Sequence, residues 1–173
     1  FRNVTGVQTC ALPICLHARD YPGDGDALPL LCFPGLTRNA RDYAALAERL
    51  SPARRVIAVE FRGRGESGYA KDPMSYVPLT YAQDVLALLD EQKIDRLVAV
   101  GTSLGGIVTM LLAGLAPGRI AGALLNDVGP DIEPAGLARI RGYVGKSRDR
   151  KSTRLNSSHV SESRMPSSAW KKK

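Results

Sequence analysis

This 173-residue sequence has only two histidines and three cysteines, and no apolar run long enough to cross a membrane. No secretory signal is visible either, so we favour a cytoplasmic location. Of the cysteines, only Cys32 lies clear of the chain ends, and a lone cysteine in an apolar stretch is expected to be a small core residue. Because histidine is the usual general base in catalysis, its scarcity leaves few positions for one.

The two ends of the chain look foreign to the segment between them. Asp149 to His159 and Val4 to Ile14 can be encoded by the two complementary strands of one DNA duplex. That duplex resembles an adapter ligated to DNA fragments for sequencing, and Ser163 to Ala169 resembles its continuation. We therefore expect residues 1–15 to be a non-native head, 148–173 to be a non-native disordered tail, and 16–147 to be the domain.

The basic net charge belongs mainly to these ends. Of the total of +7, residues 149–173 contribute +5 and Arg2 contributes +1, which leaves +1 for the remainder. The domain therefore lacks the basic footprint of a nucleic-acid-binding protein. We expect neither a nucleic-acid nor a membrane partner, and we leave the oligomeric state open.

The most informative stretch is a short apolar run over 97–100 that leads into the pattern G-x-S-x-G, with Ser103 as its serine. An apolar helical run over 104–115 follows directly. A strand, a sharp turn and a helix in this order lift the serine hydroxyl clear of the sheet. The N–H of Leu104, at the helix start, would then face an oxyanion formed when Ser103 attacks a carbonyl. Glycines without a Cβ let the strand and helix approach closely, and they are Gly101, Gly105 and Gly106.

The rest of the chain alternates between short apolar runs and helical periods, which predicts an α/β fold with a mostly parallel sheet and flanking helices. Asn39 is a candidate N-cap for an amphipathic helix over 43–50, and the capping-box pattern at Thr80 predicts the start of a second helix. A further helix is expected over 137–144. Strands are expected over 28–33, 55–60, 97–100 and 120–126, with the end of an earlier strand at 16–19.

A second glycine pattern, G-x-G-x-x-G over 63–68, follows one of these strands. In a dinucleotide-binding site such a pattern opens a helix at once, so that the helix N-terminus holds the pyrophosphate. Here Asp72-Pro73 and Val77-Pro78 interrupt the segment, so we expect a loop and no nucleotide.

From 16 to 145 the chain resembles the N-terminal half of an α/β-hydrolase domain, on the strength of G-x-S-x-G in its strand–turn–helix context and of the R-G-x-G-x-S loop at 62–67. The resemblance implies that Ser103 is the nucleophile and that the N–H groups of Leu36 and Leu104 form an oxyanion hole. Pro34 stands where the family often has histidine, and Asp127, after the strand over 120–126, is a candidate triad acid.

The resemblance implies a serine hydrolase that acts on an ester, lactone or similar small substrate, without a cofactor or a metal. The alternatives are a non-catalytic ligand-binding domain of the same fold, and a haloperoxidase or carbon–carbon bond hydrolase. No credible base is visible, because His17 precedes the nucleophile and is expected to be a surface strand residue, and His159 lies in the predicted tail. We therefore expect the parent protein to be the active hydrolase and this 173-residue chain to have little activity.

Overall fold

The computed structural model describes residues 4–10, 14–129, 131, 134–135 and 138. In this part of the chain, six strands form one sheet in the order β1-β2-β4-β3-β5-β6. Strands β4, β3, β5 and β6 are parallel, and β2 runs antiparallel to both β1 and β4. The strands are β1 Thr5–Thr9, β2 Leu16–Tyr21, β3 Leu30–Phe33, β4 Val56–Glu60, β5 Leu97–Thr102 and β6 Ile120–Asn126.

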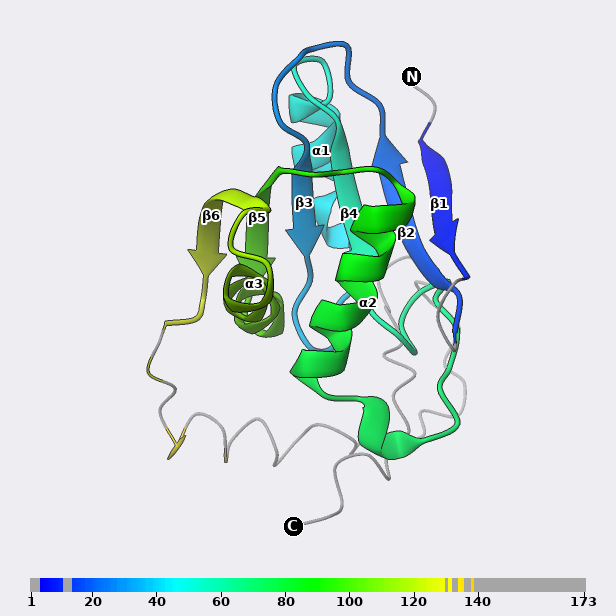
Figure 1. The fold of residues 1–173 in the computed structure, drawn as a ribbon, viewed down its shortest axis with the longest axis vertical. Helices are drawn as coiled ribbons and strands as arrows, with labels where there is room; N and C mark the ends of the chain where they lie inside the picture. The colour runs from blue at the N-terminus through cyan, green and yellow to red at the C-terminus, as the bar shows by residue number, and fades with distance from the viewer. Residues whose placement is uncertain (1–3, 11–13, 130, 132–133, 136–137, 139–173) are drawn as a thin grey trace, which may run out of the picture.

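Helices cover both faces of the sheet (Figure 1). The side chains of α2 and α3 pack with Leu31, Phe33 and Ile57 in one apolar cluster, whereas α1 packs with Leu30 and Cys32 in the cluster on the opposite face. Because both faces are covered, the central strands consist mostly of apolar residues, and polar side chains such as Glu60 and Thr102 stand at their carboxyl ends. The helical elements are η1 Ala40–Tyr43, α1 Ala44–Leu50, η2 Pro73–Ser75, α2 Pro78–Glu91 and α3 Leu104–Leu115.

The predicted fold class is confirmed, because the sheet is mostly parallel and has helices on its flanks. The expected spans of β6 and α3 agree with the structure, and Asn39 caps the helical segment that follows it by accepting a hydrogen bond from the Arg41 N–H. The expected start of α2 at Thr80 is wrong. The helix begins at Pro78, since a proline at the first helical position already has the required φ and an extended Val77 precedes it. Of the helix expected over 137–144, only residue 138 is among the described residues.

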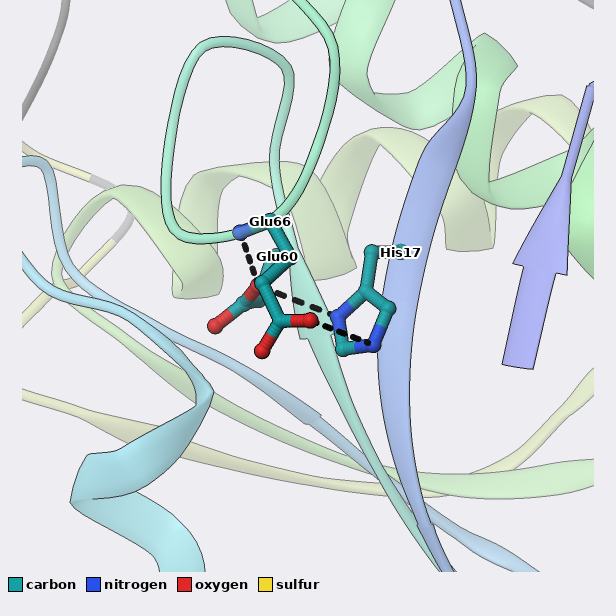
Figure 2. Close-up of side chains that lie close together, drawn as sticks. All are labelled: His17, Glu60 and Glu66. Atoms are coloured by element: carbon teal, nitrogen blue, oxygen red, sulfur yellow. Dashed lines mark hydrogen bonds and ion pairs between the residues drawn. The ribbon is translucent and has the colours of Figure 1, made fainter. Parts of the chain in front are cut away.

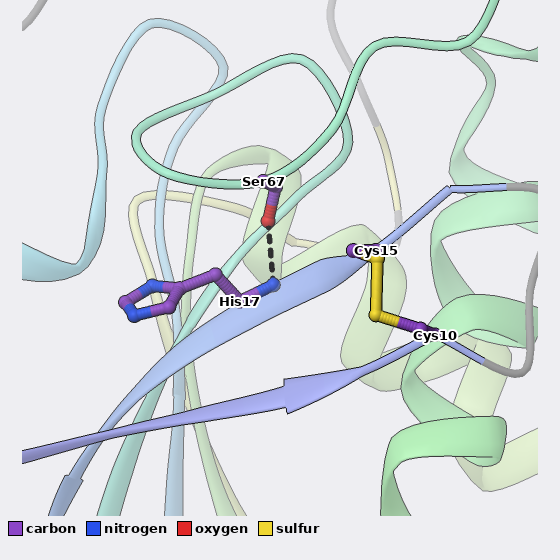
Figure 3. The surroundings of a disulfide bond; sticks show 4 residues. All are labelled: Cys10, Cys15, His17 and Ser67. Carbon is purple, nitrogen blue, oxygen red and sulfur yellow. Dashed lines mark hydrogen bonds between the residues drawn. A yellow bond between two sulfur atoms is a disulfide. The ribbon is translucent and has the colours of Figure 1, made fainter.

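Residues of the predicted head form β1, which pairs with β2 along its whole length. Figure 3 shows the disulfide between Cys10 and Cys15 that joins the ends of these two strands. A foreign origin for residues 1–15 stays a prediction. Cys32, by contrast, is fully buried as a free thiol, as expected for a small core residue, and this burial raises its pKa to about 12.

Strand β6 forms one edge of the described sheet, and most of its side chains are exposed. Leu124 is 56% exposed and Leu125 is 39% exposed, although both belong to a parallel strand. None of the helices in the described ranges combines the length and the apolar character that a membrane span requires.

Candidate functional site

Ser103 lies in the turn between β5 and α3, where the backbone takes an unfavourable conformation. Its φ is 51° and its ψ is −114°, so a residue with a side chain occupies the left-handed half of the φ range. The Ser103 N–H donates to the Asn126 carbonyl at 2.9 Å, and the Ser103 carbonyl accepts from the Gly106 N–H at 2.9 Å. These bonds hold the turn in place, and the strand–turn–helix context predicted from the sequence is present.

The glycines around the turn allow the close approach of strand and helix. A Cβ on Gly101 would overlap the Gly105 carbonyl, and a Cβ on Gly105 would overlap the carbonyl of Phe33 at the end of β3. A Cβ on Gly106 would overlap the side chain of Val128, in the segment after β6. Gly101 and Gly105 therefore need glycine because fixed backbone atoms fill the space, whereas a side chain at Gly106 would require Val128 to move.

The loop that follows β3 lies directly beside the turn. A Cβ built on Gly35 would be 3.8 Å from the Ser103 Cβ, so this backbone passes within van der Waals distance of the serine. Among the described residues, neither the Leu36 N–H nor the Leu104 N–H has a hydrogen-bond partner. Leu104 is the first residue of α3, where helical N–H groups point outward without an intrahelical acceptor. Both amides predicted for an oxyanion hole are thus unused at this edge of the sheet.

Tyr43, the first residue of the amphipathic helix expected over 43–50, joins the carboxyl ends of β3 and β5. The Tyr43 hydroxyl donates to the Phe33 carbonyl at 2.8 Å and lies 3.0 Å from the Thr102 Oγ1. Burial raises the pKa of Tyr43, although its hydrogen bond with Thr102 opposes the shift. The hydroxyl is therefore a neutral donor that fixes the end of β3 beside the end of β5.

Asp127 lies immediately after β6, at the same edge of the sheet as Ser103. It is exposed and has a φ of 57°, and the residue before it accepts the hydrogen bond from the Ser103 N–H. Within the described ranges, the Asp127 carboxylate makes no hydrogen bond to Ser103 or to a histidine. Its role as a triad acid stays a prediction.

His17 is not a surface residue, and this expectation is wrong. It is 5% exposed, and its Nδ1 lies 3.1 Å from the Oε2 of Glu60, which is also buried (Figure 2). Its Nε2 lies 3.8 Å from the exposed Glu66 carboxylate. Because the two carboxylates approach different ring nitrogens, the arrangement is that of an imidazole between two carboxylates, with a hydrogen bond to Glu60 and a longer contact to Glu66, rather than of ligands around one metal ion.

This cluster attaches the glycine-rich loop to β2. The backbone N–H of His17 donates to the Ser67 hydroxyl at 2.8 Å (Figure 3). The backbone N–H of Glu66 donates to the Glu60 carboxylate at 2.7 Å (Figure 2). The Ser67 hydroxyl in turn donates to the Glu60 carbonyl. His17 is therefore engaged in the loop attachment, with its imidazole directed at Glu60 and Glu66.

The glycine-rich segment over 61–68 is a loop, as predicted, and no helix opens from it. Gly63 and Gly65 have φ values of 71° and 54°, which explains the glycines at these two positions. Arg62 is buried and forms a two-pronged ion pair with Asp84 of α2, with distances of 2.7 and 2.6 Å. Burial raises the pKa of Asp84, and the hydrogen bond from the Arg62 guanidinium opposes that shift.

Comparison with known proteins gives consistent matches. The family model described as alpha/beta hydrolase fold matches residues 29–150. A 3-hydroxybutyrate-oligomer hydrolase from Cupriavidus necator is 38% identical over 143 residues, which are 81% of this chain and 49% of that protein.

Solved structures agree with this match. An alpha/beta hydrolase from Novosphingobium aromaticivorans superposes with a TM-score of 0.80 and 55% identity, over 84% of this chain and 52% of that one. An N-acyl homoserine lactonase superposes with a TM-score of 0.65 and 25% identity, over 83% of this chain and 49% of that one. This chain thus spans about half the length of these proteins.

Proposed function

Because this chain belongs to the alpha/beta hydrolase fold family, we propose that it is part of a serine hydrolase that cleaves a carboxylic ester or lactone of a small molecule. The observation that carries this proposal is the turn at Ser103, which presents a hydroxyl at the carboxyl edge of the sheet. Such a backbone conformation costs about 1–3 kcal/mol at a residue other than glycine, and this kind of strain clusters at functional sites.

In the proposed reaction, the Ser103 oxygen attacks the substrate carbonyl carbon, and the carbonyl oxygen gains negative charge. The two unused N–H groups of Leu36 and Leu104 are the donors we propose for that charge. Leu104 also contributes the positive end of the α3 dipole. Because both donors are backbone groups, their side chains are free to differ from those of other hydrolases.

The reaction also needs a base that accepts the serine proton, because a serine hydroxyl is a weak nucleophile at neutral pH. His17 is engaged with Glu60, and no other histidine is among the described residues. We therefore propose that the base comes from beyond the described residues, and we propose Asp127 as a candidate for the acid that orients it. Until such a base is present, Ser103 should react slowly.

The matched relatives support an ester or lactone as the substrate. One of them is named for the hydrolysis of 3-hydroxybutyrate oligomers and another for the hydrolysis of N-acyl homoserine lactones. Oligomers of a hydroxy acid are joined by ester bonds, and a lactone is an internal ester, so both reactions require the same nucleophile and oxyanion donors.

The test is covalent labelling of the purified 173-residue chain with a fluorophosphonate, followed by peptide mass spectrometry. We expect one adduct on Ser103, lost in Ser103→Ala and kept in a control variant, Ser75→Ala, which changes a serine distant in sequence from the turn. The rate should be well below that of an ordinary serine hydrolase, because no histidine lies beside Ser103 in the described residues.

Adducts spread over several serines, or none on Ser103, would contradict the proposed nucleophile and favour a non-catalytic binding domain. Selective labelling at an ordinary hydrolase rate would support the nucleophile and contradict the expectation that this 173-residue chain reacts slowly.

A further inference from the structure

Arg64 is almost fully buried, although it is a charged residue in a glycine-rich loop. It is 1% exposed, and its Nε donates to the carbonyl of Leu36 at 2.7 Å. The carbonyl of Arg62 lies 3.4 Å from its Nη1. The guanidinium therefore joins the glycine-rich loop after β4 to the loop after β3.

Two aromatic rings hold this guanidinium in position. Its Cζ lies 5.1 Å from the ring centre of Tyr81 and 5.7 Å from that of Phe61, and these two rings stack on each other with centres 5.1 Å apart. A cation over an aromatic face is attracted by the electrons of the ring, which partly offsets the loss of hydration. The planar group is thus restricted to one orientation, with its Nε directed at Leu36.

The contact with Leu36 constrains two successive peptide groups. The Arg64 guanidinium holds the carbonyl of Leu36, while the carbonyl of Gly35 accepts a hydrogen bond from the Arg38 N–H at 3.2 Å. The Gly35 carbonyl and the Leu36 N–H belong to the same planar peptide group, so the direction of one determines the direction of the other. Together the two hydrogen bonds set the direction of the Leu36 N–H.

We propose that Arg64 is a positioning residue for the oxyanion hole: its buried guanidinium fixes the Leu36 peptide so that the N–H faces the oxygen developing on a substrate bound at Ser103. This inference rests on the proposed hydrolase function for its consequence, but the contact with Leu36 can be tested separately. Loss of one oxyanion donor lowers the catalytic rate about 10²–10³-fold, and a misdirected donor should cause part of that loss.

The experiment compares three substitutions at Arg64 with a matched control in the full 173-residue chain. Arg64→Met removes the donor and keeps the apolar stem, Arg64→Lys keeps a cation, and Arg64→Gln keeps a neutral donor. The control is Arg119→Met, which removes a guanidinium that donates to the Ile94 carbonyl at 3.2 Å. The first measurement, by NMR, is the chemical shift and the order parameter of the Leu36 amide, and hydrogen exchange of the α2 and α3 amides checks that the variant is folded.

We expect Arg64→Met to shift the Leu36 amide signal and to lower its order parameter from the rigid-backbone range of about 0.85 towards the flexible range below about 0.6, while amides of α2 and α3 keep their exchange rates. Arg64→Lys should restore part of the order, and Arg119→Met should leave Leu36 unchanged. If the Arg64→Met variant does not fold, the Arg64→Gln variant gives the same comparison, with a smaller expected change at the Leu36 amide. An unchanged Leu36 amide in a folded Arg64 variant overturns the proposal.

The second measurement is the rate of fluorophosphonate labelling at Ser103 as a function of probe concentration. The maximal rate should fall about 10–100-fold in Arg64→Met with little change in the half-saturating concentration, and Lys should rescue part of it. A fall confined to probe binding, or one accompanied by fast exchange throughout α2 and α3, would show a merely structural role. If Ser103 of the unsubstituted chain is not labelled, the hydrolase proposal fails, and the Leu36 amide still decides the role of Arg64.

Discussion

The close approach of α3 to β3 can be tested with two glycines of the same helix. A Cβ at Gly105 would overlap the backbone carbonyl of Phe33, whereas a Cβ at Gly114 would meet nothing within 4 Å. Alanine at either position gains about 0.5–1 kcal/mol from helix propensity. At Gly105 this gain is opposed by overpacking against backbone atoms, which costs about 1–3 kcal/mol.

We therefore expect Gly114→Ala to raise the free energy of unfolding by about 0.5–1 kcal/mol and Gly105→Ala to lower it by up to about 2.5 kcal/mol. Because the propensity gain is common to both positions, the two variants should differ by the overpacking cost of about 1–3 kcal/mol. At about 2–4 °C per kcal/mol for a chain of this size, their melting temperatures should be separated by about 2–12 °C.

The assay is urea unfolding at 25 °C, followed by circular dichroism, with thermal melting as a second measurement. Gly105→Ala should also slow fluorophosphonate labelling of Ser103, because the turn is built on the same close approach. Equal effects of the two substitutions on stability would refute the steric reasoning, and so would a Gly105→Ala variant that is more stable than the unsubstituted chain.

Three further changes test the surroundings of the site. Tyr43→Phe should lower the free energy of unfolding by about 1–3 kcal/mol, because the Phe33 carbonyl loses its buried donor, while Tyr69→Phe at a half-exposed position should have little effect in the same urea titration. Asp84→Asn should cost about 3–5 kcal/mol, because it leaves a buried arginine unpaired, whereas Asp90→Asn in an exposed pair should cost less than about 1 kcal/mol. Because burial raises the pKa of Cys32 to about 12, the free energy of unfolding should keep its full value below the ordinary thiol pKa. It should fall by up to about 1.4 kcal/mol per pH unit as the pH rises from about 9 towards 12, because only the thiol of the unfolded chain ionises in that range. Cys32→Ala should remove this slope in unfolding titrations at pH 8, 9 and 10, and an unchanged slope would rule the thiol out as its cause.

Local signals were sufficient for the turn at Ser103 and for the elements on either side of it. All the signals lie within twenty residues: the apolar run, the glycines of G-x-S-x-G and the helical run that follows them. The local sequence pattern is therefore enough to predict the strand, the turn and the helix. The β6 strand was also predictable, because its apolar run is bounded by Gly118 and by Asp127.

The contacts that complete the site were not predictable, because each joins residues far apart in the chain. Tyr43 fits the apolar face of a helix, and nothing in its neighbourhood indicates that its hydroxyl reaches Phe33 and Thr102. A polar residue such as His17 is expected at the surface, but its hydrogen bond with Glu60, 43 residues away, makes its burial possible. In the same way, the R-G-x-G-x-S pattern predicted a loop around Arg64 but gave no indication of its contact with Leu36.

The exposed edge strand has a consequence for how the site opens. β6 is held by β5 on one side only in the described sheet, whereas β3 and β4 each lie between two neighbours. Protection against local opening should therefore fall from the centre of the sheet towards β6. Since the Ser103 N–H donates to the carbonyl of Asn126 at the end of that strand, each opening of this end of β6 should release one of the bonds that hold the strained turn.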